Sequence, residues 1–342
     1  NYACINMTGG FRHMNIRIKR GAALTLTAAL LLAGSTQALF GLGKSRMEAA
    51  VPENAPAAQD LEICTYRGIP YQGQLEASDP DGGEVTFSIV TQPKKGTVTL
   101  EGASFTYSPG ENALGGDSFT YAAVNGDGVS SAPATVTVTI EKVRSGVTYG
   151  DTDAASAAAA QELAERGIFT GSKIGETWYF EPERTVSRGE FLAMVLETAG
   201  TEVTEVTMTG FCDDDAIPTW AKGYAAAGAA EGIVEGKPTD SGAAFSCDAP
   251  ISCSEAATVL NRVLNLGDVE LEVWYADREA VPSWAAQAVG NMEALNVLSV
   301  GSFGSEGLEA AVTRGDAARM LSAAGTLLRG EEPSGLLGWL KS

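Results

Sequence analysis

The stretch TVSRGEF at residues 185–191 recurs in altered form as PISCSEA at 250–256 and AVTRGDA at 311–317. In each copy a hydroxyl residue stands three positions before an acidic one. The pairs are Ser187/Glu190, Ser252/Glu255 and Thr313/Asp316. This is capping-box spacing, in which the hydroxyl and the carboxylate each satisfy a backbone N–H at a helix start. The sequence therefore predicts three helices that begin at the same point of three imperfect repeats.

Other elements recur in the same order around these helix starts. An aromatic residue precedes an aspartate in Tyr149/Asp151, Phe211/Asp213 and Tyr275/Asp277. A glycine-containing turn follows in GIFTG (167–171), GIVEG (232–236) and NVLSVG (296–301). Ala-rich amphipathic stretches alternate with these loops, which indicates helices. We place the three repeats at 147–200, 207–266 and 271–330.

The repeated region resembles three S-layer homology domains. Trp220-Ala221 and Trp284-Ala285 match the Trp-Ala pair that opens the first helix of that family, and Phe180-Glu181-Pro182 matches its Phe-x-Pro loop. The resemblance implies an all-α, pseudo-threefold helical domain. It also implies that grooves between the repeats hold a pyruvylated secondary cell-wall polysaccharide.

The resemblance assigns roles to individual residues. Arg188 and Arg314 would pair with the ketal carboxylate at helix N-termini, which favour anions. Trp220 and Trp284 would wall the grooves, although burial alone also explains a tryptophan. The remaining candidates are the glycines that would let sugar approach the backbone and the acidic caps: Gly171, Gly236, Gly301, Glu190 and Asp316. The third repeat, with Trp284 and Arg314, is the strongest single candidate.

Each repeat departs from the family pattern. Repeat one has Ala155 at the tryptophan position, and repeat two has Cys253 at the arginine position. Repeat three has Asn296 and an extra residue in its glycine turn. We therefore expect the grooves to be unequal, with at least one inactive or purely structural.

Residues 57–143 show a different, period-two pattern. Short runs rich in Thr, Val and aromatics are separated by turn signals at DPDGG (79–83), PKKG (93–96) and NGDG (125–128). This pattern predicts an antiparallel β-sandwich. ASDPDGGEVTFSI, PKKGTVTL and GGDSFTYAAVNGDG resemble bacterial Ig-like, cadherin-like modules. Asp79, Asp81 and Asp117 are weak calcium candidates on turns, since the full EF-hand spacing is absent.

The N-terminal segment has the features of a leader peptide. Arg17, Lys19 and Arg20 precede an apolar stretch, and Thr36-Gln37-Ala38 gives a small-x-small cleavage site. Residues 1–38 are interpreted as an upstream extension and a cleaved signal peptide, 39–56 as a linker and 331–342 as a short tail. We therefore expect an exported protein at the cell wall or cell surface, with no membrane contact after cleavage.

Composition argues against several functions. The chain has 342 residues and a net charge of −20, which repels nucleic acid and anionic membrane. Its single histidine, His13, lies in the leader, so histidine-dependent catalysis and most zinc sites are disfavoured. We expect no enzyme and no cofactor. A carboxylate-based glycan hydrolase is a remote alternative, because no segment remains for a catalytic domain.

Two further features stay open. Cys212, Cys247 and Cys253 cluster in repeat two, where one disulfide is feasible in an exported protein. The leading function is non-covalent anchoring to secondary cell-wall polysaccharide with display of the Ig-like module. An adhesin, whose Ig-like module binds an external protein or glycan, is the alternative, and self-association is a further partner hypothesis.

Overall fold

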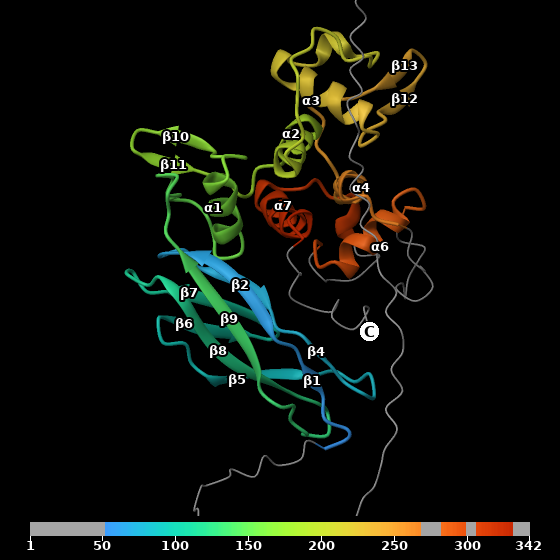
Figure 1. Ribbon diagram of the computed structural model, residues 1–342. Helices are drawn as coiled ribbons and strands as arrows, with labels where there is room; N and C mark the ends of the chain where they lie inside the picture. Colours follow the sequence, from blue (N-terminus) through green and yellow to red (C-terminus); the bar gives the residue numbers. More distant parts are fainter. Residues whose placement is uncertain (1–51, 268–281, 299–305, 331–342) are drawn as a thin grey trace, which may run out of the picture. The chain divides into compact units, whose positions relative to one another are not determined.

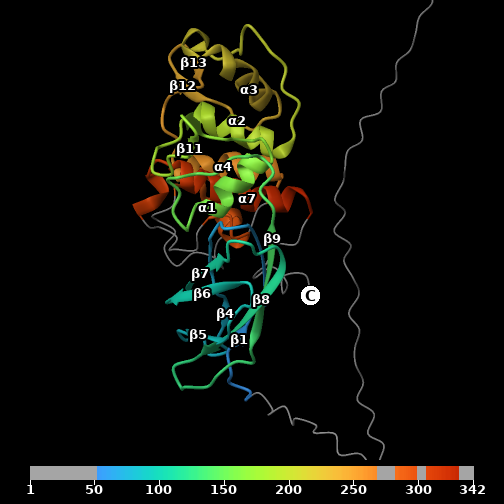
Figure 2. The same ribbon diagram turned by 90° about the vertical axis from the view of Figure 1, so that its left-hand side faces the viewer.

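A computed structural model describes residues 52–267, 282–298 and 306–330. Its first part is a pair of facing sheets (Figure 1, Figure 2). The four-stranded sheet has the order β2-β9-β8-β5, from strands β2 (Leu61–Tyr66), β5 (Thr86–Thr91), β8 (Gly115–Val124) and β9 (Ala134–Glu141). The three-stranded sheet has the order β3-β7-β6, from β3 (Tyr71–Gln74), β6 (Gly96–Glu101) and β7 (Ser104–Pro109). Short strands β1 (Ala57–Ala58) and β4 (Ala77–Ser78) pair with each other.

The predicted sandwich is confirmed, but it is not wholly antiparallel. β2 pairs with β9 in parallel, from Leu61 opposite Val136 to Tyr66 opposite Glu141, whereas β5, β8 and β9 pair antiparallel. Period-two patterning sets which face of a strand is buried but leaves the direction of its partner open. The parallel pair is therefore a feature that alternation could not reveal.

Two Phe-Thr-Tyr tripeptides supply the centre of the sandwich core. Phe105 and Tyr107 come from β7, and Phe119 and Tyr121 from β8; each is at most 1% exposed. Residues two apart in a strand share a face, so each tripeptide turns both aromatic rings inward. Phe105 meets Phe119 edge to face, with ring centroids 5.4 Å apart. Burying each such ring contributes about 1.5–3 kcal/mol.

The second part of the chain is mainly helical. The helices are α1 (Ala157–Glu165), α2 (Arg188–Ala199), α3 (Thr219–Ala230), α4 (Cys253–Leu264), α6 (Ala286–Ala294) and α7 (Arg314–Leu328), with short 3₁₀ turns η1 (Asp214–Ala216) and η3 (Glu306–Glu309). All three predicted capping boxes are confirmed. Ser187, Ser252 and Thr313 accept from the backbone N–H three residues later, and the acidic partners reach back to the cap residues.

The prediction that this part is all-α is wrong. In the described residues of this part, two antiparallel hairpins interrupt the helices: β10 (Ser172–Ile174) with β11 (Thr177–Tyr179), and β12 (Lys237–Thr239) with β13 (Gly242–Ala244). Each strand has only three residues, too few for a period-two pattern to be detected. The first hairpin turns at Gly175, whose φ of 64° suits a tight turn.

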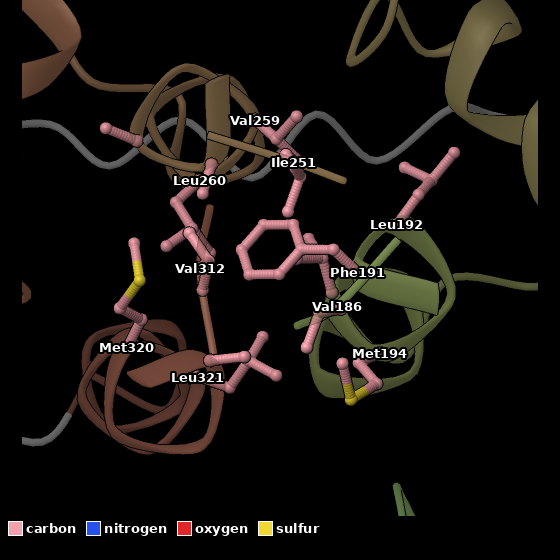
Figure 3. Close-up of a cluster of buried hydrophobic side chains, with 14 of the residues drawn as sticks. Val186, Phe191, Leu192, Met194, Ile251, Val259, Leu260, Val312, Met320 and Leu321 are labelled. Atoms are coloured by element: carbon pink, nitrogen blue, oxygen red, sulfur yellow. The ribbon is translucent and has the colours of Figure 1, made fainter. Parts of the chain in front are cut away.

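Three backbone hydrogen bonds join the repeats in a closed ring. The N–H of Val186 donates to the carbonyl of Val312, that of Val312 to Ile251, and that of Ile251 to Val186, at 2.9–3.1 Å. Each residue directly precedes a capping residue. Figure 3 shows their side chains in one cluster with Phe191, Leu260 and Leu321. The ring fixes the three capped helix starts relative to one another.

No helix in the described ranges is long and apolar enough to cross a membrane. The leader, residues 39–51 of the linker, Tyr275, Asp277, Gly301 and the tail lie outside those ranges.

Candidate functional site

Arg188 connects the first repeat to the second. Its Nε donates to the carbonyl of Phe245 at 2.9 Å, and its Nη1 lies 3.1 Å from a carboxylate oxygen of Glu255. The guanidinium carbon also lies 5.8 Å from the centre of the Phe245 ring. The Arg188 side chain is buried. Arg188 is the first residue of α2, whereas Phe245 and Glu255 belong to repeat two. Arg188 therefore holds two repeats together.

Arg314 makes the matching connection from the third repeat to the first. Its Nη1 donates to the carbonyl of Phe180 at 2.6 Å and lies 3.0 Å from Glu181. Its guanidinium carbon lies 4.8 Å from the Phe169 ring centre. The two arginines thus use the same combination of a phenylalanine carbonyl, a carboxylate and an aromatic face. Each already holds a protein carboxylate, so an incoming acidic ligand would share or exchange that position.

Two aspartates shape the loops that these arginines contact. The carboxylate of Asp151 accepts from the backbone N–H groups of Phe180 and Glu181, at 2.8 and 2.7 Å. Asp213 accepts from those of Phe245 and Ser246, both at 2.8 Å. These contacts help to stabilise Glu181 and Ser246 at φ values of 56° and 55°, which non-glycine residues rarely adopt. The recurrence of this aspartate in the repeats indicated that it has a role. The sequence did not predict which role, because the backbone N–H groups that it binds lie about thirty residues further along the chain.

The junction from repeat two to repeat three is built differently. Cys253 occupies the arginine position, and its backbone N–H donates to the carbonyl of Ala310 at 3.1 Å. The next residue, Ser254, donates its hydroxyl to the carbonyl of Leu308 at 2.9 Å. Burial, with the nearby charges of Asp316 and Glu293, raises the pKa of the Cys253 thiol to about 11. At this position a neutral thiol therefore replaces the guanidinium.

Of the three glycines proposed to admit sugar, the two within the described residues, Gly171 and Gly236, lie against the chain's own backbone. A Cβ on Gly171 would lie 2.2 Å from the carbonyl oxygen of Tyr179, and one on Gly236 would lie 2.9 Å from that of Ala244. Both glycines also have positive φ, 67° and 79°. The hairpins account for these residues without a ligand. The sugar-approach role stays a prediction.

A different pair of glycines lies beside the arginines. A Cβ on Gly189 would lie 2.4 Å from the Cys247 sulfur and 3.6 Å from the Trp220 ring. A Cβ on Gly315 would lie 3.4 Å from Pro182 and from Ser156. The Arg-Gly dipeptide that repeats one and three share could have identified these two glycines from the sequence. Sequence reasoning missed these glycines because their neighbours belong to other repeats.

Trp220 and Trp284 are both exposed, at 52% and 59%. Trp220 lies near Gly189, the residue after Arg188, so one junction has both an arginine and an exposed tryptophan. Arg314 instead faces Phe169, Phe180 and Glu181 of repeat one. The structure therefore brings Trp220 to the helix start of Arg188, whereas the grouping of Arg314 with Trp284 stays a prediction.

The acidic caps have local partners. Glu190 pairs with Arg184 at 2.8 Å in addition to its capping contacts. Burial would raise the pKa of Asp316, but hydrogen bonds from Thr313 and Arg319 outweigh that effect and lower it. Both carboxylates are engaged at their helix starts. Their contribution to ligand binding stays a prediction.

The other departures from the repeat pattern have structural explanations. Asn296 has a φ of 54°, close to the 71° of Gly167 and the 69° of Gly232 in the corresponding turns. Asparagine tolerates this left-handed conformation better than most residues, so the turn is retained. The disulfide considered in repeat two is not formed, because Cys212, Cys247 and Cys253 are all free thiols. Cys247 lies against Gly189, whereas Cys212 contacts Thr239.

Two of the calcium candidates, Asp79 and Asp117, accept hydrogen bonds from backbone N–H groups of turns, and Asp117 does so from strand β8. Asp79 accepts from the backbone N–H of Asp81 at 2.8 Å. Asp117 accepts from the N–H groups of Lys94 and Lys95 and from the hydroxyl of Tyr107, at 2.8–2.9 Å. Burial would raise the pKa of Asp117, but these hydrogen bonds lower it overall. Within the described ranges, no group of three or more acidic, histidine or cysteine residues could hold a metal ion.

Residues 50–142 match the family model described as the bacterial cadherin-like domain. This region is therefore a bacterial cadherin-like, Ig-like module, as the sequence predicted. The match does not extend into the helical part. The search of curated proteins returned no match.

Several solved structures resemble about a quarter of the chain. An endo-fucoidan hydrolase of glycoside hydrolase family 107 is 19% identical over 27% of this chain and 14% of its own, with a TM-score of 0.24. Titin domain M7 is 12% identical over 26% of this chain and 95% of its own, with a TM-score of 0.18. The fibronectin(III)-like modules of Clostridium thermocellum CbhA are 16% identical over 29% and 52%, with a TM-score of 0.20. At these values the similarities carry no functional argument.

Proposed function

We propose that this chain is a non-enzymatic bacterial surface protein whose three helical repeats, related to S-layer homology domains, bind an acidic secondary cell-wall polysaccharide. The cadherin-like module is then the part displayed outward. The proposal includes export through the N-terminal leader and requires no cofactor.

The observation that carries the proposal is the junction between repeats one and two. A buried arginine, a glycine at the helix start and an exposed tryptophan lie together there: Arg188, Gly189 and Trp220. An arginine with a nearby carboxylate is suited to acidic ligands, and an aromatic face suits the C–H surface of a sugar. The closed ring of hydrogen bonds through Val186, Ile251 and Val312 supports a common three-repeat arrangement.

The test is sedimentation of the full chain with purified cell walls, before and after chemical removal of pyruvate. We expect binding that falls about tenfold when the pyruvate carboxylate is lost, as for removal of a charge-assisted hydrogen bond. Undiminished binding would contradict the arginine–carboxylate mechanism. Absence of binding to untreated walls would contradict wall anchoring itself.

Matched tryptophan variants locate the site. Trp220→Ala should weaken wall binding by about tenfold or more, because Trp220 lies beside the helix start of Arg188, whereas Trp284→Ala, in the loop just before α6, should weaken it less. Equal losses would show that the two tryptophans contribute alike. Circular dichroism of both variants checks that the helices remain folded.

The adhesin alternative requires a contiguous exposed apolar patch on the cadherin-like module. Among the described residues of this module, the large apolar side chains classed as exposed are Val90 and Leu114. No specific observation favours this alternative over wall anchoring.

A further inference from the structure

Glu255 binds two cations that differ in their exposure to solvent. The Nη1 of Arg188 lies 3.1 Å from Oε2 of Glu255, and the Nζ of Lys237 lies 2.8 Å from Oε1. The side chain of Arg188 is 10% exposed, whereas that of Lys237 is 51% exposed. Burial would raise the pKa of Glu255, but the hydrogen bond from Lys237 and the charge of Arg188 outweigh it and lower the pKa. One ionised carboxylate therefore holds a buried cation on one oxygen and an accessible cation on the other.

The second hairpin fixes the place of Lys237. Lys237 begins β12 and pairs with Ala244 of β13, the residue just before Phe245. The carbonyl of Phe245 is the one that accepts from Arg188. The base of the hairpin is closely packed, because a Cβ on Gly236 would lie 2.9 Å from the carbonyl oxygen of Ala244. The backbone of Lys237 is therefore held beside the Arg188 junction, while its long side chain carries the charge on a flexible stem.

The first hairpin has a different residue at the corresponding position. Ser172 stands there, since both Ser172 and Lys237 directly follow the last glycine of the turns GIFTG and GIVEG. The neighbouring Lys173 lies 3.8 Å from Glu176 and 5.8 Å from the ring centre of Trp178, which both belong to its own hairpin. A hydroxyl in repeat one thus corresponds to the exposed cation of repeat two.

We propose that Lys237 is a second ligand-binding cation, which exchanges Glu255 for the carboxylate of an acidic wall sugar and holds that carboxylate together with Arg188. This inference rests on the wall-binding function proposed above and adds a residue to the same site. A carboxylate suits two adjacent cations because each of its oxygens can accept from one of them, as those of Glu255 do. Glu255 is then an internal competitor, which neutralises the exposed lysine until the ligand replaces it.

The experiment measures sedimentation of the full chain with purified cell walls for variants at these positions. Lys237→Met removes the charge and should weaken binding about fivefold, the effect of one exposed ion pair, whereas Lys237→Arg should bind as the wild type does. Glu255→Gln should strengthen binding about threefold, because it removes the competing charge. Glutamine at this position keeps the capping box and an acceptor for Arg188. Lys173→Met, the same change on the first hairpin, is the matched control and should leave binding unchanged.

The opposite signs expected for Lys237→Met and Glu255→Gln separate ligand binding from a structural role. If Lys237 only supported Glu255 at its helix start, both variants would weaken binding, and that result overturns the proposal. Equal losses in Lys237→Met and Lys173→Met also overturn it, because a general charge effect then explains both. Unchanged circular dichroism shows that the variants are folded.

A second assay keeps this inference distinct from wall anchoring. Pyruvate, a soluble carboxylate, is titrated into the full chain while the backbone amide of Gly189, next to Arg188, is followed by NMR. Lys237→Met should raise the dissociation constant for pyruvate about fivefold. If the wild-type chain binds no wall but this difference is observed, the proposed function fails and the inference stands. Equal dissociation constants, or no measurable binding of pyruvate by the wild-type chain, overturn the inference.

Discussion

The junction at Arg188 and the junction at Cys253 occupy the same position in successive repeats but are stabilised by different chemistry. At the first, a buried guanidinium joins the Phe245 carbonyl to the carboxylate of Glu255. At the second, the neutral Cys253 thiol and the Ser254 hydroxyl replace the guanidinium. The carboxylates of Asp316 and Glu293 lie close enough to raise the pKa of the thiol. The comparison shows that one scaffold accepts both an ionic and a neutral junction. The ionic one is then the more sensitive to substitution.

The largest expected effect is at Arg188. Arg188→Ala leaves the Phe245 carbonyl without this donor and leaves Glu255 with Lys237, at 2.8 Å, as its remaining cation. It should lower the free energy of unfolding by about 3 kcal/mol. Cys253→Ala should cost about 1 kcal/mol, since a small side chain is shortened at a partly buried position. Urea denaturation followed by circular dichroism measures both. Arg184→Ala, in an exposed pair with Glu190, is the control at about 0–1 kcal/mol.

The next largest effect on stability concerns the loop at Phe245 and Ser246, which Arg188 contacts. Asp213→Ala removes the acceptor for two backbone N–H groups and leaves Ser246 in its strained conformation. It should destabilise the chain by about 2–3 kcal/mol. Asp240→Ala, at an exposed hairpin turn, should change stability by at most about 0.5 kcal/mol. Equal effects in urea denaturation would show that the Asp213 contacts contribute nothing.

The Cys253 junction should respond to pH. Burial raises the pKa of Glu293 to about 7 from a usual value of 4.5. Because the folded chain holds this proton more tightly, the contribution of Glu293 to stability is fully present below pH 4.5 and is lost as pH rises through 7. Glu293→Gln should remove this loss and stabilise the chain at pH 8 by at most about 2 kcal/mol, allowing for solvent screening.

Urea midpoints at pH 5 and pH 8 test this expectation. Glu231→Gln, at an exposed position, controls for the general effect of removing a negative charge. If the two variants shift the midpoint equally at pH 8, burial of Glu293 is not the cause.

The smallest expected effect on stability comes from placing an arginine at position 253, as in the other two repeats. Cys253→Arg places a guanidinium near Asp316 and Glu293 and should stabilise the chain by about 1 kcal/mol. The exposed Cys212→Arg should have almost no effect. Destabilisation by Cys253→Arg alone would show that the junction has closed around the smaller side chain and cannot admit a guanidinium. Thermal unfolding of the two variants separates these outcomes.

Sequence reasoning predicted the local features well. The capping boxes at Ser187, Ser252 and Thr313 and the alternation of β9 depend on residues within a few positions of one another. The hairpins were missed because three-residue strands carry too little pattern. The parallel β2–β9 pair was missed because alternation does not encode strand direction. The identity of the repeats and of their ligand remains a proposal based on resemblance and on the Arg188 junction.

The sequence by itself determined where the three capped helices begin and which faces of the sandwich strands are apolar, because these follow from backbone hydrogen bonding and side-chain periodicity. Only the tertiary structure decided what the distinctive residues contact. Arg188 meets a carbonyl 57 positions away, and Arg314 meets one 134 positions away. Such pairings depend on how the whole chain closes on itself, since spatial neighbours in different repeats leave no fixed spacing in the sequence. The polysaccharide site that we propose therefore includes Arg188 and Trp220, which come from different repeats and meet at one helix start.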